Sequence, residues 1–245
     1  MVLTIDDGLR ACADIIAPIL KRKGIPAIFF LNNSFLDNQS LFYRYKASLL
    51  IEAYAEMKGD PEEMDENIGM ERKYARQVLL DVKYENRLLL DSIAESIGFS
   101  FEDYLKQNPV YLNSSQVTSL IKDGFEIGSH SFDHPDFDRM DADKAKTQIV
   151  ESVSDLGKRF DQKKKYFSFP FSSDGVSLKV IDGLLKEEKV DAIFGTSGLK
   201  HYPHPGFIQR IPMEVPELAA LQILKTEYLY YLAKAPFGKN TYRGG

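Results

Sequence analysis

Short apolar runs alternate with amphipathic segments over most of the chain, and this pattern predicts a parallel sheet covered by helices. The predicted buried strands are 1–5, 26–31, 125–129, 166–169, 190–194 and 207–211. The predicted helices are 9–23, 114–122, 142–160, 176–188 and 216–234. Pro18 lacks a backbone N–H and should kink the first helix, and the tail at 242–245 is expected to be frayed. A barrel and an open doubly wound sheet both fit this alternation, and both gather chemistry at the carboxyl ends of their strands.

Residues 38–112 interrupt the alternation with a long, charged segment of helical pattern. The segment is rich in tyrosine and leucine, so we expect it to pack against the rest of the chain. We interpret it as a helical insertion within a single domain that spans 1–245. Because the insertion leaves the main fold after a strand, it should lie beside the carboxyl ends of the strands.

Composition and charge narrow the possible functions. The chain has 245 residues, 44% of them hydrophobic, which is enough for a substantial core. Its formal net charge of -5 argues against a nucleic-acid binder, because phosphate-binding surfaces are basic. No apolar run reaches the roughly 18 residues that a membrane span needs. The N-terminus lacks a secretory signal, which predicts either a cytoplasmic location or a sequence that starts after a removed segment. The single cysteine, Cys12, cannot form an internal disulfide.

Candidate metal ligands follow two of the predicted strands. Asp6 and Asp7 end the first strand before Gly8, and His130 and His134 follow the strand at 125–129. An isolated Asp-Asp-Gly turn is usually solvated, and a lone pair of loop histidines can simply bond to the backbone. Together, however, two imidazoles and one carboxylate form a common ligand set for catalytic zinc. If Asp7 joins the histidines, Asp6 is free to accept a proton from water whose pKa the ion lowers.

These motifs resemble those of a known family. TIDDG at 4–8 is similar to the TFDDG motif of polysaccharide deacetylases, the carbohydrate esterases with a NodB-type homology domain. HSFDH at 130–134 is similar to their HSxxH motif, and PAIFFL at 26–31 resembles their PATFFL strand. The resemblance covers nearly the whole chain outside the insertion. It implies a distorted, incomplete (β/α) barrel and a divalent metal, most often Zn²⁺.

The resemblance also implies a role for each motif residue. Asp6 corresponds to the catalytic base, while Asp7, His130 and His134 correspond to the metal ligands. The segment SFPFS at 168–172 is similar to the FxYPYG variant of the third motif, which lacks the usual arginine.

In that third motif the backbone N–H of Phe171 would serve the oxyanion. Arg210, at a later strand end, could supply the missing positive charge beside Asp6, although a surface ion pair is an equally simple interpretation.

The closing motif of the family, a leucine-histidine-aspartate strand that supplies the general acid, is absent. His201 and His204 lie in a loop that should reach the mouth of the barrel, and they are the remaining histidine candidates. His204 is the better candidate for the acid because it is closer to the following strand. His201 is better explained as part of a mobile loop.

The predicted function is a metal-dependent hydrolase that removes acetyl groups from N-acetylated or O-acetylated sugars or polysaccharide. One alternative is an amidohydrolase of the same fold that acts on a small non-sugar amide. The other is a catalytically impaired module that binds sugar, which the missing closing motif favours.

Overall fold

Six parallel strands form one sheet in the computed structural model, which describes residues 2–57, 62, 64–66, 69–187, 189–215 and 217–242. The strands are β1 (Leu3–Ile5), β2 (Ala27–Leu31), β5 (Glu126–Ser129), β6 (Tyr166–Ser168), β7 (Ala192–Gly195) and β8 (Phe207–Gln209). Their order in the sheet is β1-β2-β5-β6-β7-β8, so each new strand joins the same growing edge. A doubly wound sheet would reverse direction at some point, and this sheet does not.

The sheet curls until its two edges approach each other. Arg210, which follows β8, donates to the side chains of Thr4 and Asp6 at β1. Inside the curl, the rings of Phe30 from β2 and Phe194 from β7 lie 5.1 Å apart. Within the described residues β1 and β8 share no backbone pairing, so the fold is a distorted, incomplete (β/α) barrel, as predicted.

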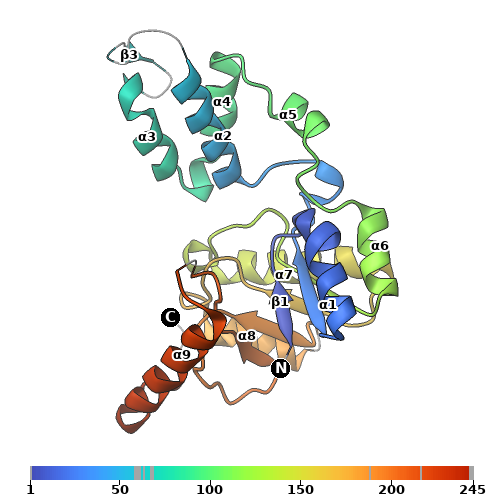
Figure 1. Cartoon of the computed structure of the whole chain (residues 1–245). Coiled ribbons are helices and arrows are strands. Elements are labelled where there is room, and N and C mark those ends of the chain that lie inside the picture. Colours follow the sequence, from blue (N-terminus) through green and yellow to red (C-terminus); the bar gives the residue numbers. More distant parts are fainter. Residues whose placement is uncertain are drawn as a thin grey trace.

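Helices cover the outside of the curled sheet (Figure 1). They are α1 (Ala17–Lys23), α6 (Ser114–Lys122), α7 (Ala142–Phe160) and α8 (Leu178–Lys186). Helix α9 (Ala220–Lys234) instead projects away from the sheet (Figure 1), and its side chains Leu221, Leu229 and Leu232 are exposed. The expected kink at Pro18 takes the form of a π-helical turn at Cys12–Ile16, directly before α1. The last helix begins at Ala220, four residues later than predicted. Pro216, where it was expected to begin, lies outside the described residues, as do Met1 and 243–245.

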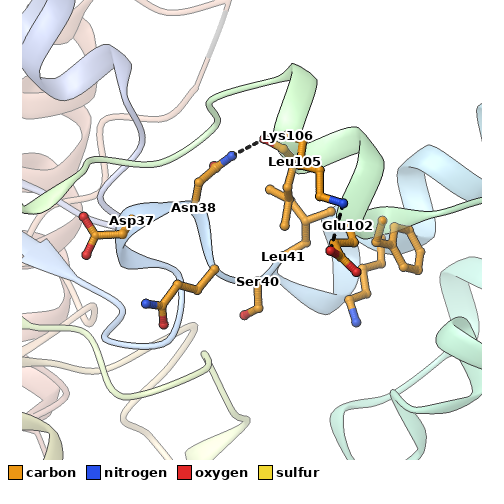
Figure 2. A pocket seen from close by; sticks show the side chains of 10 residues that line it. Asp37, Asn38, Ser40, Leu41, Glu102, Leu105 and Lys106 are labelled. Atoms are coloured by element: carbon orange, nitrogen blue, oxygen red, sulfur yellow. Dashed lines mark hydrogen bonds and ion pairs between the residues drawn. The ribbon is translucent and has the colours of Figure 1, made fainter.

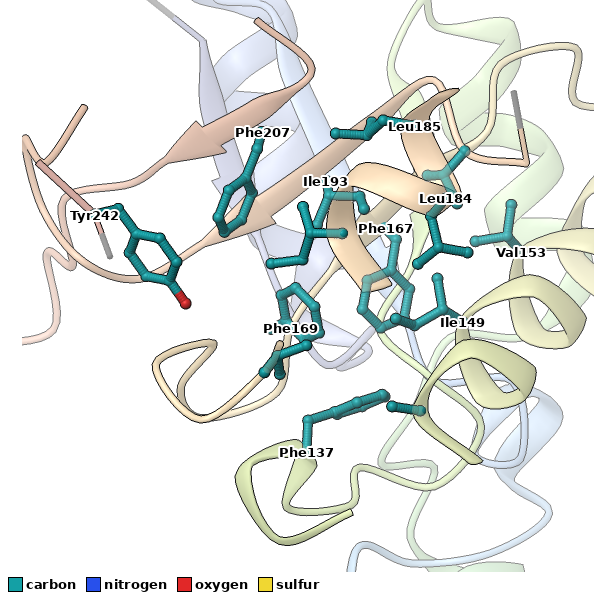
Figure 3. Packing of buried hydrophobic residues seen from close by; sticks show 14 residues of the cluster. Phe137, Ile149, Val153, Phe167, Phe169, Leu184, Leu185, Ile193, Phe207 and Tyr242 are labelled. Atoms are coloured by element: carbon teal, nitrogen blue, oxygen red, sulfur yellow. The ribbon is translucent and has the colours of Figure 1, made fainter. Parts of the chain in front are cut away.

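The main outer core lies between the second half of the sheet and helices α7 and α8 (Figure 3). Ile149 and Phe167 are fully buried there, and Ile193 packs beside them. Tyr242 joins the same core and donates a hydrogen bond to the carbonyl of Ser173. The expectation of a frayed tail is therefore wrong at this residue, because an aromatic ring near the chain end fills a gap beside β8.

Among its described residues, the segment between β2 and α6 carries four α-helices and a small antiparallel pair of strands. These are α2 (Tyr43–Glu56), β3 (Met64–Asp65), β4 (Met70–Glu71), α3 (Ala75–Asp81), α4 (Leu89–Ser96) and α5 (Phe101–Gln107). Figure 1 shows these helices grouped apart from the sheet. They enclose a separate apolar cluster that includes Leu50, Leu79 and Ile93. Within the part of the chain that the structure describes, no helix is long and apolar enough to cross a membrane.

Candidate metal and catalytic site

The turn after β1 directs the carboxylates of Asp6 and Asp7 toward the imidazole of His130. Asp7 has φ 70° and Gly8 has φ 64°, so the chain reverses through two left-handed residues. A side chain at Gly8 would also approach Leu31 Cδ2 to 3.0 Å. As a result, an oxygen of Asp6 and an oxygen of Asp7 lie 3.8 and 3.7 Å from the same imidazole nitrogen, Nε2 of His130.

His130 is held by hydrogen bonds from its backbone and from its ring. Its backbone N–H donates to the carbonyl of Leu31 at 2.8 Å, and its Nδ1 lies 2.9 Å from the carbonyl oxygen of Ser168. The carbonyl can only accept, so Nδ1 carries the proton and Nε2 keeps a free lone pair. Burial lowers the pKa of His130. The contact with Ser168 thus fixes the tautomer, and burial favours the neutral imidazole that binds metals.

His134 reaches the site from a constrained turn. His134 and Ser131 have φ values of 62° and 72°, a region that non-glycine residues rarely adopt. The backbone N–H of His134 donates to the hydroxyl of Ser131 at 3.1 Å. This turn places Nε2 of His134 at 3.3 Å from Oδ1 of Asp7.

The structure thus brings together Asp7, His130 and His134, whose potential ligand atoms all lie within 4.8 Å of one another. Oδ1 of Asp7 is buried and has no hydrogen-bond partner among the described residues. Burial raises the pKa of Asp7, but the contact with His134 and the charges of both histidines lower it by more, so it lies below its ordinary value. An ionised carboxylate and two imidazoles around one point fit a divalent cation such as zinc.

Asp6 lies beside these three candidate ligands, and its carboxylate is bound by Arg210. Arg210 donates to both oxygens of Asp6, at 2.8 and 2.9 Å, and to the hydroxyl of Thr4 at 3.1 Å. Its Nε donates to the carbonyl of Gly195 at 3.2 Å. Of the two interpretations of Arg210, the structure favours the contact with Asp6, because the side chain of Arg210 is only 13% exposed. The pair orients the carboxylate of Asp6.

Phe171 also lies at the site. Its φ of 54° is left-handed, so Asp7, Ser131, His134 and Phe171 all adopt a backbone conformation that is costly without glycine. The ring of Phe171 packs 4.5 Å from the imidazole of His134, centroid to centroid. Its carbonyl accepts a hydrogen bond from the hydroxyl of Thr196 at 3.1 Å, which ties the third motif to the loop after β7.

His204 does not reach this site, and the expected position of its loop is wrong. The carbonyl of His204 accepts from the N–H of Phe207, the first residue of β8, at 3.1 Å. His204 therefore lies at the amino end of the sheet, whereas Asp6 lies at the carboxyl end. A connection between parallel strands must travel the length of the sheet, so residues just before a strand emerge at the far edge. His201 is exposed, and its N–H donates to the carbonyl of Asn240.

The segment between β2 and α6 contributes residues that motif reasoning did not find. Phe42 packs 4.4 Å from the imidazole of His134, and the guanidinium carbon of Arg44 lies 4.3 Å from the ring centre of Phe171. Tyr84 donates to the carboxylate of Asp133, between the two candidate histidine ligands. The available signal was the aromatic run at 42–45, which follows the strand-end loop.

A pocket of about 560 Å³ lies at the base of this segment, away from the candidate ligands (Figure 2). It is lined by residues from 37–41 and α5 and by Lys46 of α2. The amide of Asn38 joins two of its walls by donating to the carbonyl of Leu105 at 2.6 Å. None of the candidate catalytic or metal residues lines this pocket. Its volume therefore does not identify the reactive site, which is defined by the donor atoms at the strand ends.

Comparison with protein families identifies the class of protein. The family model for polysaccharide deacetylase matches residues 1–189, so the chain belongs to the polysaccharide deacetylase family. The resemblance inferred from the motifs is thereby confirmed.

Individual relatives are distant. The uncharacterized protein YlxY of Bacillus subtilis is 26% identical over 93 residues, which is 38% of this chain and 28% of that protein. The Streptococcus pyogenes deacetylase PplD, solved in complex with acetate, has a TM-score of 0.54 at 14% identity, covering 92% of this chain and 69% of its own. A de-N-acetylase from Aggregatibacter actinomycetemcomitans has a TM-score of 0.53 at 14% identity, covering 92% and 74%. At 14% identity, the similarity to these two solved structures establishes the fold alone.

Proposed function

We propose that the protein is a metal-dependent hydrolase that removes acetyl groups from N-acetylated or O-acetylated sugars or polysaccharide. The observation that carries this proposal is that a set of candidate metal ligands and a separately held carboxylate lie side by side at the carboxyl ends of β1 and β5. Asp7, His130 and His134 supply donor atoms within 4.8 Å of one another. Asp6 lies beside them but is engaged by Arg210 instead.

Asp7, His130 and His134 would hold a divalent metal, and Zn²⁺ is the ion that best matches these donors. When bound, the cation would supply a Lewis acid for the acetyl carbonyl and favour hydroxide over water at neutral pH. The carbonyl of Ser168 keeps His130 in the tautomer that such binding needs.

Asp6 would act as the base. Its carboxylate accepts a proton from the attacking water, and the water oxygen bonds to the acetyl carbon. Arg210 keeps Asp6 aimed by its paired contacts. The backbone N–H of Phe171 would stabilise the negative charge that develops on the carbonyl oxygen.

The bond from the carbonyl carbon to the sugar nitrogen or oxygen then breaks, and the leaving atom takes up a proton. His204 lies at the other end of the sheet and is not positioned for that transfer. Asp6 has just accepted a proton at the reacting centre, so we propose that it returns this proton to the leaving atom.

The test combines metal analysis with acetate release. Purified protein should contain close to one divalent ion per chain and release acetate from acetylated chitooligosaccharides. Asp6→Asn should keep the metal and lose the activity. Metal without activity on any acetylated glycan, together with glycan binding, would favour the sugar-binding module. Activity confined to small non-sugar amides would favour the other alternative.

A further inference from the structure

The loop between the two candidate histidine ligands is strained and needs anchors. Ser131 and His134 both have left-handed φ values, a backbone conformation that is unfavourable for residues other than glycine. On the barrel side, the N–H groups of Asn33 and Ser34 donate to the carbonyls of Ser131 and Phe132, at 3.2 and 3.0 Å. These anchors end one residue before Asp133. The N–H of His134 donates within the loop itself, to the hydroxyl of Ser131.

Asp133 is anchored from the inserted segment instead. The hydroxyl of Tyr84 lies 2.7 and 2.9 Å from the two carboxylate oxygens of Asp133, and Nη2 of Arg87 lies 3.3 Å from one of them. The guanidinium of Arg87 also stacks over the ring of Tyr84, at 3.9 Å from its centre. Tyr84 packs against Tyr43, which belongs to the buried cluster of the inserted helices. The side chains that hold Asp133 are therefore themselves held by the packing of the inserted segment.

His134 depends on this anchor more than His130 does. Nδ1 of His130 bonds to a carbonyl, whereas Nδ1 of His134 is buried and has no hydrogen-bond partner among the described residues. The ring of His134 therefore lacks the hydrogen bond that fixes the ring of His130. Its direction is set by the backbone next to Asp133 and by packing between Phe42 and Phe171, at 4.4 and 4.5 Å.

We propose that Tyr84 is a positioning residue for the metal centre: by holding Asp133, with Arg87 beside it, Tyr84 aims His134 at Asp7. The inserted segment thus completes a metal site whose ligands all come from the barrel. This inference rests on the proposed function, because it assumes that Asp7, His130 and His134 bind a divalent ion.

The experiment measures Zn²⁺ affinity, not activity. Metal-free protein competes with a chromophoric chelator for Zn²⁺, and thermal unfolding of each metal-free variant is recorded alongside. Tyr84→Phe removes only the hydroxyl and should weaken Zn²⁺ binding about 10-fold, the usual effect of losing a partner that orients a ligand. Tyr202→Phe is the matched control, because Tyr202 donates a comparable hydrogen bond to Asp182 at 3.0 Å in the barrel. Its affinity should stay within about 2-fold of the wild type.

A double-mutant cycle with Asp133→Asn separates positioning from general damage. If Tyr84 acts through Asp133, the double variant should bind Zn²⁺ no more weakly than Asp133→Asn alone. Wild-type affinity in Tyr84→Phe, or fully additive losses, would overturn the inference while leaving the proposed function untouched. A wild type that binds no Zn²⁺ would overturn both. The wild type could also bind Zn²⁺ normally, and Tyr84→Phe could show the predicted loss of affinity, while the wild type releases no acetate. That result would contradict only the proposed function.

Discussion

Replacing Arg210 by glutamine should loosen the closure of the barrel. Arg210 joins the two edges of the sheet, since it follows β8 and bonds to Asp6 and Thr4 at β1. Hydrogen bonds between charged groups contribute about 1.5–3 kcal/mol each, before solvent screening. The side chains of Arg210 and Asp6 are 13% and 26% exposed, so screening is partial. We expect a loss of about 2–3 kcal/mol, which lowers the melting temperature of a chain of this size by about 4–12 °C.

The assay is thermal unfolding of the metal-free protein, followed by circular dichroism, with Arg10→Gln as the matched control. Arg10 pairs with Asp14 on an exposed helix surface, where the side chains are 44% and 48% exposed. Such pairs contribute at most about 1 kcal/mol, so the control should melt within about 4 °C of the wild type. In an Asp6→Asn background the effect of Arg210→Gln should shrink, because the charge it pairs with is gone. The reasoning is refuted if Arg210→Gln and Arg10→Gln destabilise the protein equally.

Three further outcomes test the division of roles at the strand ends. Asp6→Asn should retain bound zinc and lose acetate release, whereas Asp7→Asn should lose zinc affinity; equal loss of metal in both variants would show that the roles are misassigned. His204→Ala should keep acetate release within about 2-fold, because His204 lies at the far end of the sheet, and a loss of the roughly 10²–10⁴-fold typical of a general acid would restore it as the candidate. Removing the metal with a chelator should abolish acetate release, and adding back Zn²⁺ should restore it; unchanged activity after the metal content has fallen to zero would contradict metal dependence.

Sequence reasoning succeeded where a residue's position follows from local structure. Asp6 and His130 each come directly after a strand, and carboxyl ends of parallel strands share one edge of a sheet. Two motifs more than a hundred residues apart could therefore be placed together from the order of the predicted strands alone. The same logic placed Arg210 at this edge, because it directly follows the residues of β8, but it left the partner of Arg210 open.

The same reasoning predicted the wrong end of the sheet for His204, because it considered only the strand that precedes this residue. His204 follows β7 in the chain, but it also lies three residues before β8. In a parallel sheet the second fact decides its position, since the chain must return to the amino end before a strand can begin. Its neighbours Pro203 and Pro205 restrict the backbone but carry no information about which edge of the sheet it reaches.

The sequence by itself determined the alternation of strands and helices, and with it the edge at which Asp6, Asp7 and the two histidines meet. Those features depend on hydrophobic periodicity and on the direction of each strand, which are local properties of the chain. Only the tertiary structure decided which distant partners these residues acquire. Arg210 reaches Asp6 because the sheet curls, and Tyr84 reaches Asp133 because the inserted helices pack over the loop. Each contact joins residues far apart in the sequence, and the hydrophobic periodicity of a single element says nothing about such pairs. They meet because whole elements pack against one another.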